Sequence, residues 1–326
     1  MSVFKNKIDS NKLSSIVKTL SSCELGFGEN VSLLEKKFNQ FSNKDYNIAT
    51  SSASAAAFIL FSYLKDIYGV CDVYVPSLTF NSPVWAAYHN HHNIIFIDVQ
   101  DDGNFCCEDY LQQRESEDQS GRVKVVMPTL YSGVSTIKNF KLLGDEIVIV
   151  DSAHCVTPTI NSDFIFFSFH PQKPICSSDG GMLCCNDSTA KSYFESFRNF
   201  GRSDHSCFDY DIIRDGFKFY MNNLNAAIAL SQLDNQKLLT RERKKRFEML
   251  QASFGNDLCE HDPNSTYYFA TLISEKSNYF NKKYKLKKLY PPLHKTSFYK
   301  DANHRVLPNT DRIYENLCNI PLSHFP

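Results

Sequence analysis

The strongest constraint on the fold is an alternation of short apolar runs with helical patterns over the first two-thirds of the chain. Segments with helical periodicity, such as Val31–Phe41, Ala55–Leu64 and Pro83–Tyr88, lie among six candidate strands. Most of the strand candidates are uninterrupted apolar runs, as in strands that a parallel sheet buries on both faces. They are Val73–Val75, Ile94–Ile97, Val123–Met127, Ile147–Val150, Phe164–Phe169 and Met182–Cys185. The alternation predicts an α/β fold with right-handed crossovers between strands.

The last part of the chain has a different pattern. A mainly helical stretch extends from residue 223 to residue 250, and Thr266–Ile273 then has the composition of a strand. A chain of 326 residues has room for about two domains. We therefore predict a large domain over residues 1–235 and a smaller C-terminal domain over residues 236–326.

Charge and hydropathy exclude several classes of protein. The 35 Lys and Arg residues nearly balance the 36 Asp and Glu residues, which argues against a generally basic nucleic-acid binder. The longest apolar stretch, Ala53–Phe61, is far shorter than the ~18–20 residues that cross a bilayer. The N-terminal residues contain no apolar region of a secretory signal. We expect a cytoplasmic protein without membrane or nucleic-acid partners.

The 11 cysteines do not indicate disulfides or a metal site. Adjacent pairs occur at residues 106–107 and 184–185, no C-x-x-C is present, and a chain of this size does not need covalent stapling. No His and Cys cluster has the spacing of zinc ligands. His89, His91 and His92 offer a surface metal patch, but a loop or helix end is the interpretation we favour. We expect no metal.

Lys173 is the first candidate for chemistry. It follows a candidate buried strand in the segment Ser168-Phe-His-Pro-Gln-Lys173-Pro, where apolar residues surround it. Desolvation lowers the pKa of a lysine and makes the neutral amine available for a Schiff base. Gly180-Gly181 then permits a tight turn beside the same site.

Asp151 and the segment Ser52–Ala57 are the other candidates. Asp151 ends an apolar strand, where ligands of open α/β sheets bind, and a buried carboxylate there needs a cationic partner. The alternative for Asp151 alone is a helix cap. The small residues of Ser52–Ala57 open a helix whose backbone N–H groups, with the Ser54 hydroxyl, are suited to an anion, although ordinary capping explains them as well.

Several segments, taken in their order along the chain, resemble those of DegT/StrS-type nucleotide-sugar aminotransferases. These are pyridoxal-phosphate (PLP) enzymes of the aspartate-aminotransferase fold type I. The resemblance covers nearly the whole chain, and S-F-H-x-x-K and N-A-A-I-A-L-S-Q-L are its most specific parts. The matching segments are Ser52–Ala57, Pro76–Phe80, Val150–His154, Ser168–Lys173, Asp179–Gly181, Gly216–Phe219 and Ala226–Leu233.

The resemblance implies a mostly parallel seven-stranded sheet flanked by helices, with a small C-terminal α/β domain that is shortened here. It also implies catalytic roles for three residues. Lys173 would carry PLP as a Schiff base and shuttle a proton between substrate and cofactor. Asp151 would pair with the protonated pyridine nitrogen, and His154 would hydrogen-bond the ring oxygen.

The remaining cofactor contacts are implied in the same way. Phe80 would stack on the cofactor ring. Ser54, the backbone N–H groups of Ala53 and Ser54, and Ser168 would hold the phosphate. Lys218 would reach that phosphate from the partner subunit, so the resemblance implies a homodimer with shared active sites.

Three more residues are candidates for contact with the sugar: Tyr131, Tyr220 and His294. Ordinary packing is an equal alternative for Tyr131, and a surface loop is the alternative for His294. Tyr220 stands where relatives often carry Arg or Asn, so its contacts differ from the family pattern.

The implied reaction is transfer of an amino group from L-glutamate to a nucleotide-linked keto-sugar. A 4-keto-6-deoxy sugar for surface polysaccharide, such as the O-antigen of lipopolysaccharide, is the acceptor we favour. One alternative is a PLP-dependent sugar dehydratase of the same fold, but such relatives carry His in place of Lys173. Another is a non-catalytic descendant that senses a ligand or serves in assembly.

Overall fold

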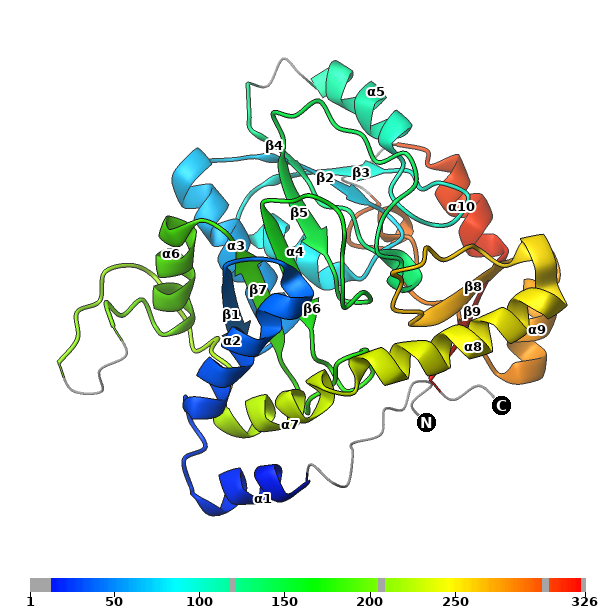
Figure 1. Ribbon diagram of the computed structural model, residues 1–326. Coiled ribbons are helices and arrows are strands. Elements are labelled where there is room, and N and C mark those ends of the chain that lie inside the picture. The colour runs from blue at the N-terminus through cyan, green and yellow to red at the C-terminus, as the bar shows by residue number, and fades with distance from the viewer. Residues whose placement is uncertain (1–12, 118–120, 205–208, 301–304, 324–326) are drawn as a thin grey trace.

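The computed structural model describes residues 13–117, 121–204, 209–300 and 305–323. Its centre is a seven-stranded sheet in the order β1-β7-β6-β5-β4-β2-β3 (Figure 1). β7 is antiparallel to both of its neighbours, and the other paired strands are parallel. The strands are β1 (Tyr46–Thr50), β2 (Asp72–Pro76), β3 (Asn93–Ile97), β4 (Lys124–Val126), β5 (Ile147–Asp151), β6 (Phe164–Ser168) and β7 (Gly181–Cys185).

This arrangement confirms the predicted α/β fold, and each of the six predicted apolar runs coincides with a strand to within one residue at either end. Different helices cover the two faces of the sheet. Successive side chains of a strand point to opposite faces, so neighbouring residues of one strand pack into different cores. In β2, Val73 and Val75 belong to one apolar core and Tyr74 to the other. Unbroken apolar runs are therefore required on these strands.

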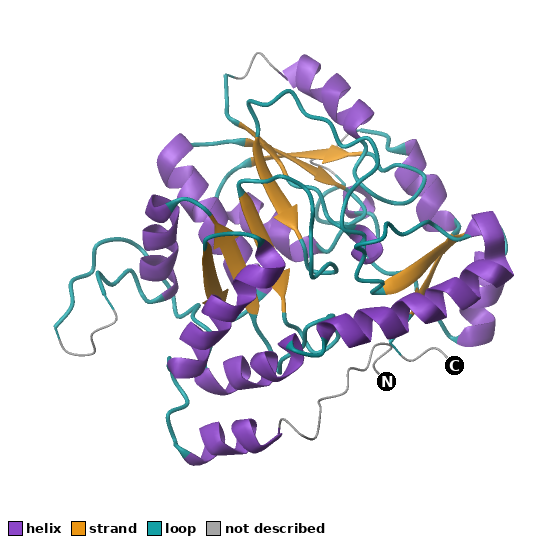
Figure 2. Cartoon of the chain, in the orientation of Figure 1, coloured by secondary structure: helices purple, strands orange, loops and turns teal. Residues whose placement is uncertain are grey.

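The first core contains α3 (Ala53–Tyr68), α4 (Asn81–His89) and α6 (Ser188–Arg198). The second contains α2 (Glu29–Ser42), α5 (Cys107–Glu117) and α7 (Asn223–Leu233), and α1 (Leu13–Ser21) contacts α7. Helices thus flank the strands on both sides, as the purple and orange elements of Figure 2 show.

The C-terminal part begins with the long helix α8 (Gln236–Phe254), which extends from the end of α7 to a second sheet (Figure 1). That sheet pairs β8 (Phe269–Ile273) antiparallel with β9 (Leu317–Pro321), beside α9 (Ser277–Tyr284) and α10 (Pro308–Glu315). The short 3₁₀ helices are Tyr131–Gly133, Gly255–Asp257 and Leu293–Lys295. The predicted division after residue 235 falls between α7 and α8. It stays a prediction, because Leu293 and Leu307 also pack into the first core of the large sheet.

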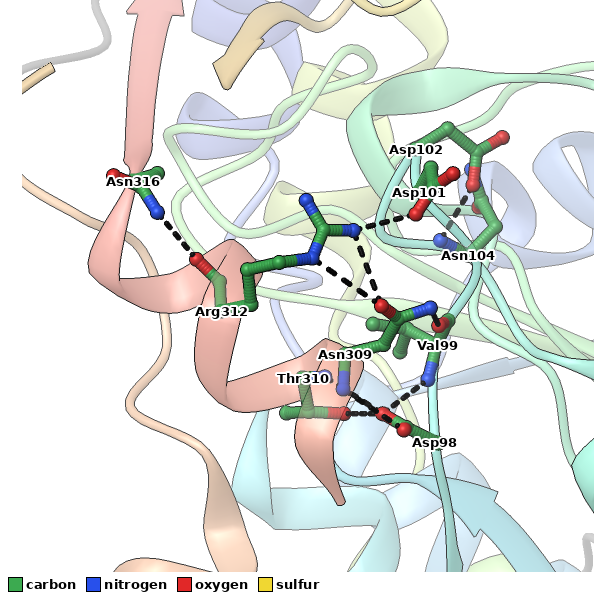
Figure 3. Close-up of polar contacts among 9 residues, drawn as sticks. All are labelled: Asp98, Val99, Asp101, Asp102, Asn104, Asn309, Thr310, Arg312 and Asn316. Atoms are coloured by element: carbon green, nitrogen blue, oxygen red, sulfur yellow. Dashed lines mark hydrogen bonds and ion pairs between the residues drawn. The ribbon is translucent and has the colours of Figure 1, made fainter. Parts of the chain in front are cut away.

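α10 is docked on the edge of the large sheet by the Asp98 carboxylate, which directly follows β3 (Figure 3). Asp98 Oδ1 accepts hydrogen bonds from the backbone N (2.6 Å) and Oγ1 (2.6 Å) of Thr310, and Oδ2 accepts one from the backbone N of Asn309 (3.0 Å). Asn309 Nδ2 donates to the Val99 carbonyl, and Arg312 pairs with Asp101. A carboxylate at a helix N-terminus satisfies free N–H groups and complements the helix dipole.

Among the helices of the described residues, none is long and apolar enough to cross a membrane. The cytoplasmic location stays a prediction.

Candidate active site

A cavity of about 430 Å³ lies at the carboxyl ends of β5 and β6, beside the N-terminus of α3. Its volume is within the range of about 300–1,000 Å³ typical of small-molecule sites. Its place at strand ends is the usual one for a ligand of an α/β sheet. Seven of the predicted site residues line it together: Ala53, Ser54, Phe80, Asp151, His154, Ser168 and Lys173.

Asp151 is the last residue of β5 and is 3% exposed. Its Oδ1 accepts a hydrogen bond from the backbone N of Ala153 (3.0 Å), and its side chain also bonds the Thr129 hydroxyl. Burial raises the pKa of the carboxyl from 3.8 to about 6, against the opposing effects of Ala153, Lys173 and Thr129. An ionised carboxylate here favours a further positive group in the cavity.

Lys173 lies in the turn that follows β6, where its backbone N donates to the His170 carbonyl (2.8 Å). Its Nζ is 5.4 Å from the centre of the Tyr268 ring and donates to Tyr290 Oη (3.4 Å). Burial lowers the pKa of the amine from 10.5 to about 8, and the negative charge of Asp151 opposes this shift. A large fraction of the amine is therefore unprotonated and nucleophilic just above neutral pH.

His154 is 2% exposed and follows β5 by three residues. Its Nε2 is 2.9 Å from Tyr290 Oη, while the buried Nδ1 has no hydrogen-bond partner within the described part of the chain. Burial, reinforced by the charge of Lys173, lowers the pKa of the imidazole well below 6.5, so the ring is neutral. A neutral imidazole has one donor and one acceptor nitrogen for the site.

The N-terminus of α3 faces the cavity because Gly181 allows the two backbones to approach closely. A Cβ at position 181 would lie 2.5 Å from the Ser52 carbonyl carbon and 2.6 Å from the Ala53 N. Ser52 caps the helix by accepting from the backbone N of Ala55 (3.1 Å). The first N–H groups of a helix lack intrahelical acceptors, so this end can bind an anion, with the Ser54 and Ser168 side chains beside it.

Aromatic side chains form the walls of the cavity. Phe80 lies at the N-terminus of α4, and its side chain is 55% exposed at the mouth. Its ring centre is 5.5 Å from that of Tyr290, which lines the cavity together with Tyr268. A flat ring fits a space bounded by these faces.

Tyr131 and His294, two of the predicted sugar contacts, do not line this cavity. Tyr131 is fully buried, and its Oη accepts from Asn319 Nδ2 (3.1 Å), which corresponds to the packing alternative. His294 is also buried, with Nδ1 2.7 Å from Ser77 Oγ and Nε2 3.3 Å from Asp311. Tyr131 thus connects the segment after β4 to β9, and His294 connects the segment after β2 to α10.

Lys218 and Tyr220 lie in the segment before α7, outside this chain's own cavity. Lys218 is exposed, with its Nζ 5.7 Å from the centre of the Tyr220 ring. The Tyr220 ring packs edge-on against Phe27 at 6.0 Å. Lys218 is predicted to contact the phosphate in the active site of the partner subunit. Its position in a single chain does not test that contact, which stays a proposal.

The structure brings to the site three further residues that the sequence did not predict there. Tyr290 and Tyr268 line the cavity, and Thr129 bonds Asp151. Tyr290 begins the Tyr-Pro-Pro-Leu-His segment that ends at His294. The sequence feature that could have indicated Tyr290 is its position directly before two prolines, because a proline pair restricts the backbone and so fixes where the tyrosine lies.

The family model described as the DegT/DnrJ/EryC1/StrS aminotransferase family matches residues 6–325. The chain belongs to this family. The family resemblance is thereby confirmed, as is the prediction of an aminotransferase that uses PLP.

Two relatives and two solved structures illustrate the position within the family. The chain is 25% identical over 280 residues to the UDP-4-amino-4,6-dideoxy-N-acetyl-β-L-altrosamine transaminase of Campylobacter jejuni, covering 81% of this chain and 70% of the relative. It is 25% identical over 266 residues to the spore coat polysaccharide biosynthesis protein SpsC of Bacillus subtilis, covering 76% and 67%. The fold matches Helicobacter pylori PseC, an aminotransferase of pseudoaminic acid biosynthesis, with a TM-score of 0.85 at 18% identity, covering 98% and 93%. It also matches the PLP form of Streptococcus pneumoniae Spr1654, with a TM-score of 0.85 at 20% identity, covering 99% and 93%.

The site of this family member has the features that PLP requires. The buried Asp151 carboxylate is suited to a protonated ring nitrogen, and the cradle at the start of α3 is suited to a phosphate. The Lys173 amine is available for the aldehyde. The unpartnered Nδ1 of His154 is a buried polar atom whose hydrogen bond nothing in the described chain supplies.

Proposed function

We propose that this protein transfers the amino group of L-glutamate to C4 of a nucleotide-linked 4-keto-6-deoxy sugar for surface polysaccharide. The single observation that carries the catalytic assignment is that Lys173, Asp151 and His154 meet in one cavity, with Lys173 and Asp151 in electrostatic contact. The names of the Campylobacter and Bacillus relatives support the sugar class and the polysaccharide destination.

PLP, when bound, supplies an aldehyde that condenses with amines and a ring that withdraws electrons from the bond that breaks. Asp151 holds the proton on the ring nitrogen, because its buried carboxylate gains a positive partner there. Lys173 would hold the cofactor through its Nζ and, once a substrate amine has taken its place, would accept and return the substrate proton at that atom. Its lowered pKa allows both protonation states near neutral pH.

The phosphate is held by the backbone N–H groups of Ala53 and Ser54 and by the hydroxyls of Ser54 and Ser168. These groups are neutral, and Lys173 is the only Lys or Arg that lines the described cavity. A phosphate dianion is bound more strongly by a cation. We therefore propose that Lys218 of the partner subunit completes the cradle, in an obligatory homodimer.

Phe80, which lines the same cavity as Lys173, would cover one face of the cofactor ring. The aromatic walls also reduce the access of water to the reacting carbon, which strengthens the pairing of Asp151 with its partner. Lys173 disfavours the dehydratase alternative, because relatives that dehydrate carry His at this position.

The test is spectroscopic. Protein loaded with PLP should be yellow, L-glutamate alone should remove the visible absorbance, and a nucleotide-linked 4-keto-6-deoxy sugar should restore it with formation of an amino sugar. Lys173→Ala should fail at the first step, whereas the control Lys191→Ala, at a side chain that is 39% exposed and lies outside the cavity, should behave as the wild type.

A protein that stays colourless with added PLP would refute the catalytic proposal and favour a sensing or assembly role. Colour that glutamate does not remove would refute glutamate as donor. Restoration by 3-keto but not 4-keto sugars would refute the C4 assignment. A PLP-loaded monomer in sedimentation would remove Lys218 from the site.

A further inference from the structure

The hydroxyl of Tyr290 lies between the two nitrogen groups of the site. Tyr290 Oη accepts a hydrogen bond from Lys173 Nζ at 3.4 Å and is 2.9 Å from His154 Nε2. The Tyr290 and His154 rings are nearly parallel, with 12° between their planes and 5.7 Å between their centres. Tyr290 follows α9, so the C-terminal part of the chain, which also supplies Tyr268 and Leu289 to the cavity, contributes a polar group beside residues of the large sheet.

The backbone around Tyr290 is fixed from both sides. The Leu289 N donates to Asn319 Oδ1 in β9 (2.8 Å), and the Leu293 N donates to the Ser77 carbonyl after β2 (2.9 Å). Tyr290 itself has a φ of 60°, in the left-handed region, directly before Pro291. Such a conformation is unfavourable for a bulky residue and persists where the surrounding structure imposes it, which is common at functional sites.

The donors and acceptors can be assigned by elimination. Burial raises the pKa of the Tyr290 phenol well above 10, so the hydroxyl keeps its one proton. A protonated Lys173 amine has only donors, so its bond uses the oxygen of Tyr290 as acceptor. The hydroxyl proton then points to His154 Nε2, which must be the bare acceptor nitrogen of a neutral imidazole. The proton of His154 is consequently on Nδ1.

We propose that Tyr290 is a positioning residue of this site: its hydroxyl accepts from the Lys173 amine and donates to His154 Nε2, and so fixes the amine and the imidazole tautomer together. The proposal rests on the proposed role of Lys173 as the amine that binds the aldehyde. It implies that the Lys173 amine has its native proton affinity only when the segment from Leu289 to Leu293 is docked.

The test compares Tyr290→Phe with the wild type. Phenylalanine keeps the ring and removes only the oxygen that stabilises the protonated amine. Lys173 should therefore lose its proton at lower pH, with a midpoint lower by about half to one unit, as for loss of one hydrogen bond of ordinary net strength, because the distance from Lys173 Nζ to Tyr290 Oη is 3.4 Å. The measurement is the rate at which acetic anhydride labels Lys173 in the PLP-free full-length protein as a function of pH, with the labelled peptide quantified by mass spectrometry.

At pH values below the midpoint of Lys173 deprotonation, Lys173 of Tyr290→Phe should be acetylated about 3- to 10-fold faster than Lys173 of the wild type, because the fraction of free amine rises by that factor. The matched control is Tyr131→Phe, whose ring is 6.5 Å from that of Tyr290 and whose hydroxyl bonds Asn319 instead. An unchanged or raised midpoint in Tyr290→Phe overturns the proposal. An equal shift in Tyr131→Phe also overturns it, since general loosening would then explain the effect.

A second measurement uses the wild-type protein, so it does not depend on whether a variant at position 290 folds. The ring-nitrogen NMR shifts of His154 in the wild-type protein, assigned with His154→Gln, should show hydrogen on Nδ1 and a bare Nε2. Hydrogen on Nε2 while Lys173 is protonated overturns the proposal. Neither readout depends on turnover, so failure to find transamination would refute the proposed function without deciding the role of Tyr290.

Discussion

Replacing Asp151 with asparagine should stabilise the PLP-free protein while weakening its function. The folded protein raises the pKa of this carboxyl from 3.8 to about 6, and the side chain is 3% exposed. At pH values between 3.8 and about 6, the folded state binds more protons at this carboxyl than the unfolded state does. Stability therefore falls as the pH rises through this window, and the loss is complete above it.

A difference of about two pKa units corresponds to ~3 kcal/mol in the free energy of unfolding near neutral pH. Asparagine has nearly the same shape and no charge, so it removes this cost. It also removes the negative charge that favours protonated Lys173. We therefore expect a net gain of ~1–3 kcal/mol at about pH 7.5 and almost none at about pH 4.

The assay is urea unfolding of the PLP-free wild type and Asp151→Asn at both pH values. The exposed Asp45→Asn is the control and should change stability by less than ~0.5 kcal/mol. PLP affinity should fall in Asp151→Asn, because the ring nitrogen loses its carboxylate. A variant that is equally stable or less stable than the wild type at the higher pH would refute the reasoning, since burial of this charge would then cost the apoprotein nothing.

Two further substitutions test the geometry. Gly181→Ala should weaken PLP binding at least ~10-fold and cost about 1–3 kcal/mol of stability, because its Cβ would lie 2.5 Å from the Ser52 carbonyl carbon. A binding titration checks this against Gly26→Ala, which meets no atom within 4 Å, and equal affinity of the two would contradict the close approach. Asp98→Ala should cost ~1–3 kcal/mol in urea unfolding, because it leaves the N-terminus of α10 uncapped. Asp101→Ala, at a pair whose carboxylate is 87% exposed, should cost less than ~0.5 kcal/mol, and similar losses in both variants would count against the capping role.

The parts of the structure that local sequence determines were predictable. Strands buried on both faces are mostly apolar along their whole length, so runs such as Ile147–Val150 are visible without tertiary information. Asp151 and Lys173 also stand directly after such runs, and the ends of strands are where a sheet binds ligands.

The parts that depend on docking of distant segments were not predictable. Tyr290 reaches Lys173 because Asn319 and Ser77, far away in the sequence, hold its segment in an unfavourable conformation. The same docking buries His294 against Ser77, although its pattern in the sequence favoured contact with the sugar or a surface loop. No periodicity of a single sequence encodes such contacts.

The attachment of α10 to the sheet edge bears on the route by which the proposed substrate reaches the cavity. A hinge motion that swung residues 308–321 away from β3 would break the bonds of Asp98 together with the pair between Arg312 and Asp101. Hydrogen bonds to charged groups contribute about 1.5–3 kcal/mol each, so such a swing would be rare during a catalytic cycle. We therefore expect substrates to enter and leave past the exposed side chains of Phe80 and His170 at the mouth, while the bonds of Asp98 and the pair between Arg312 and Asp101 stay intact.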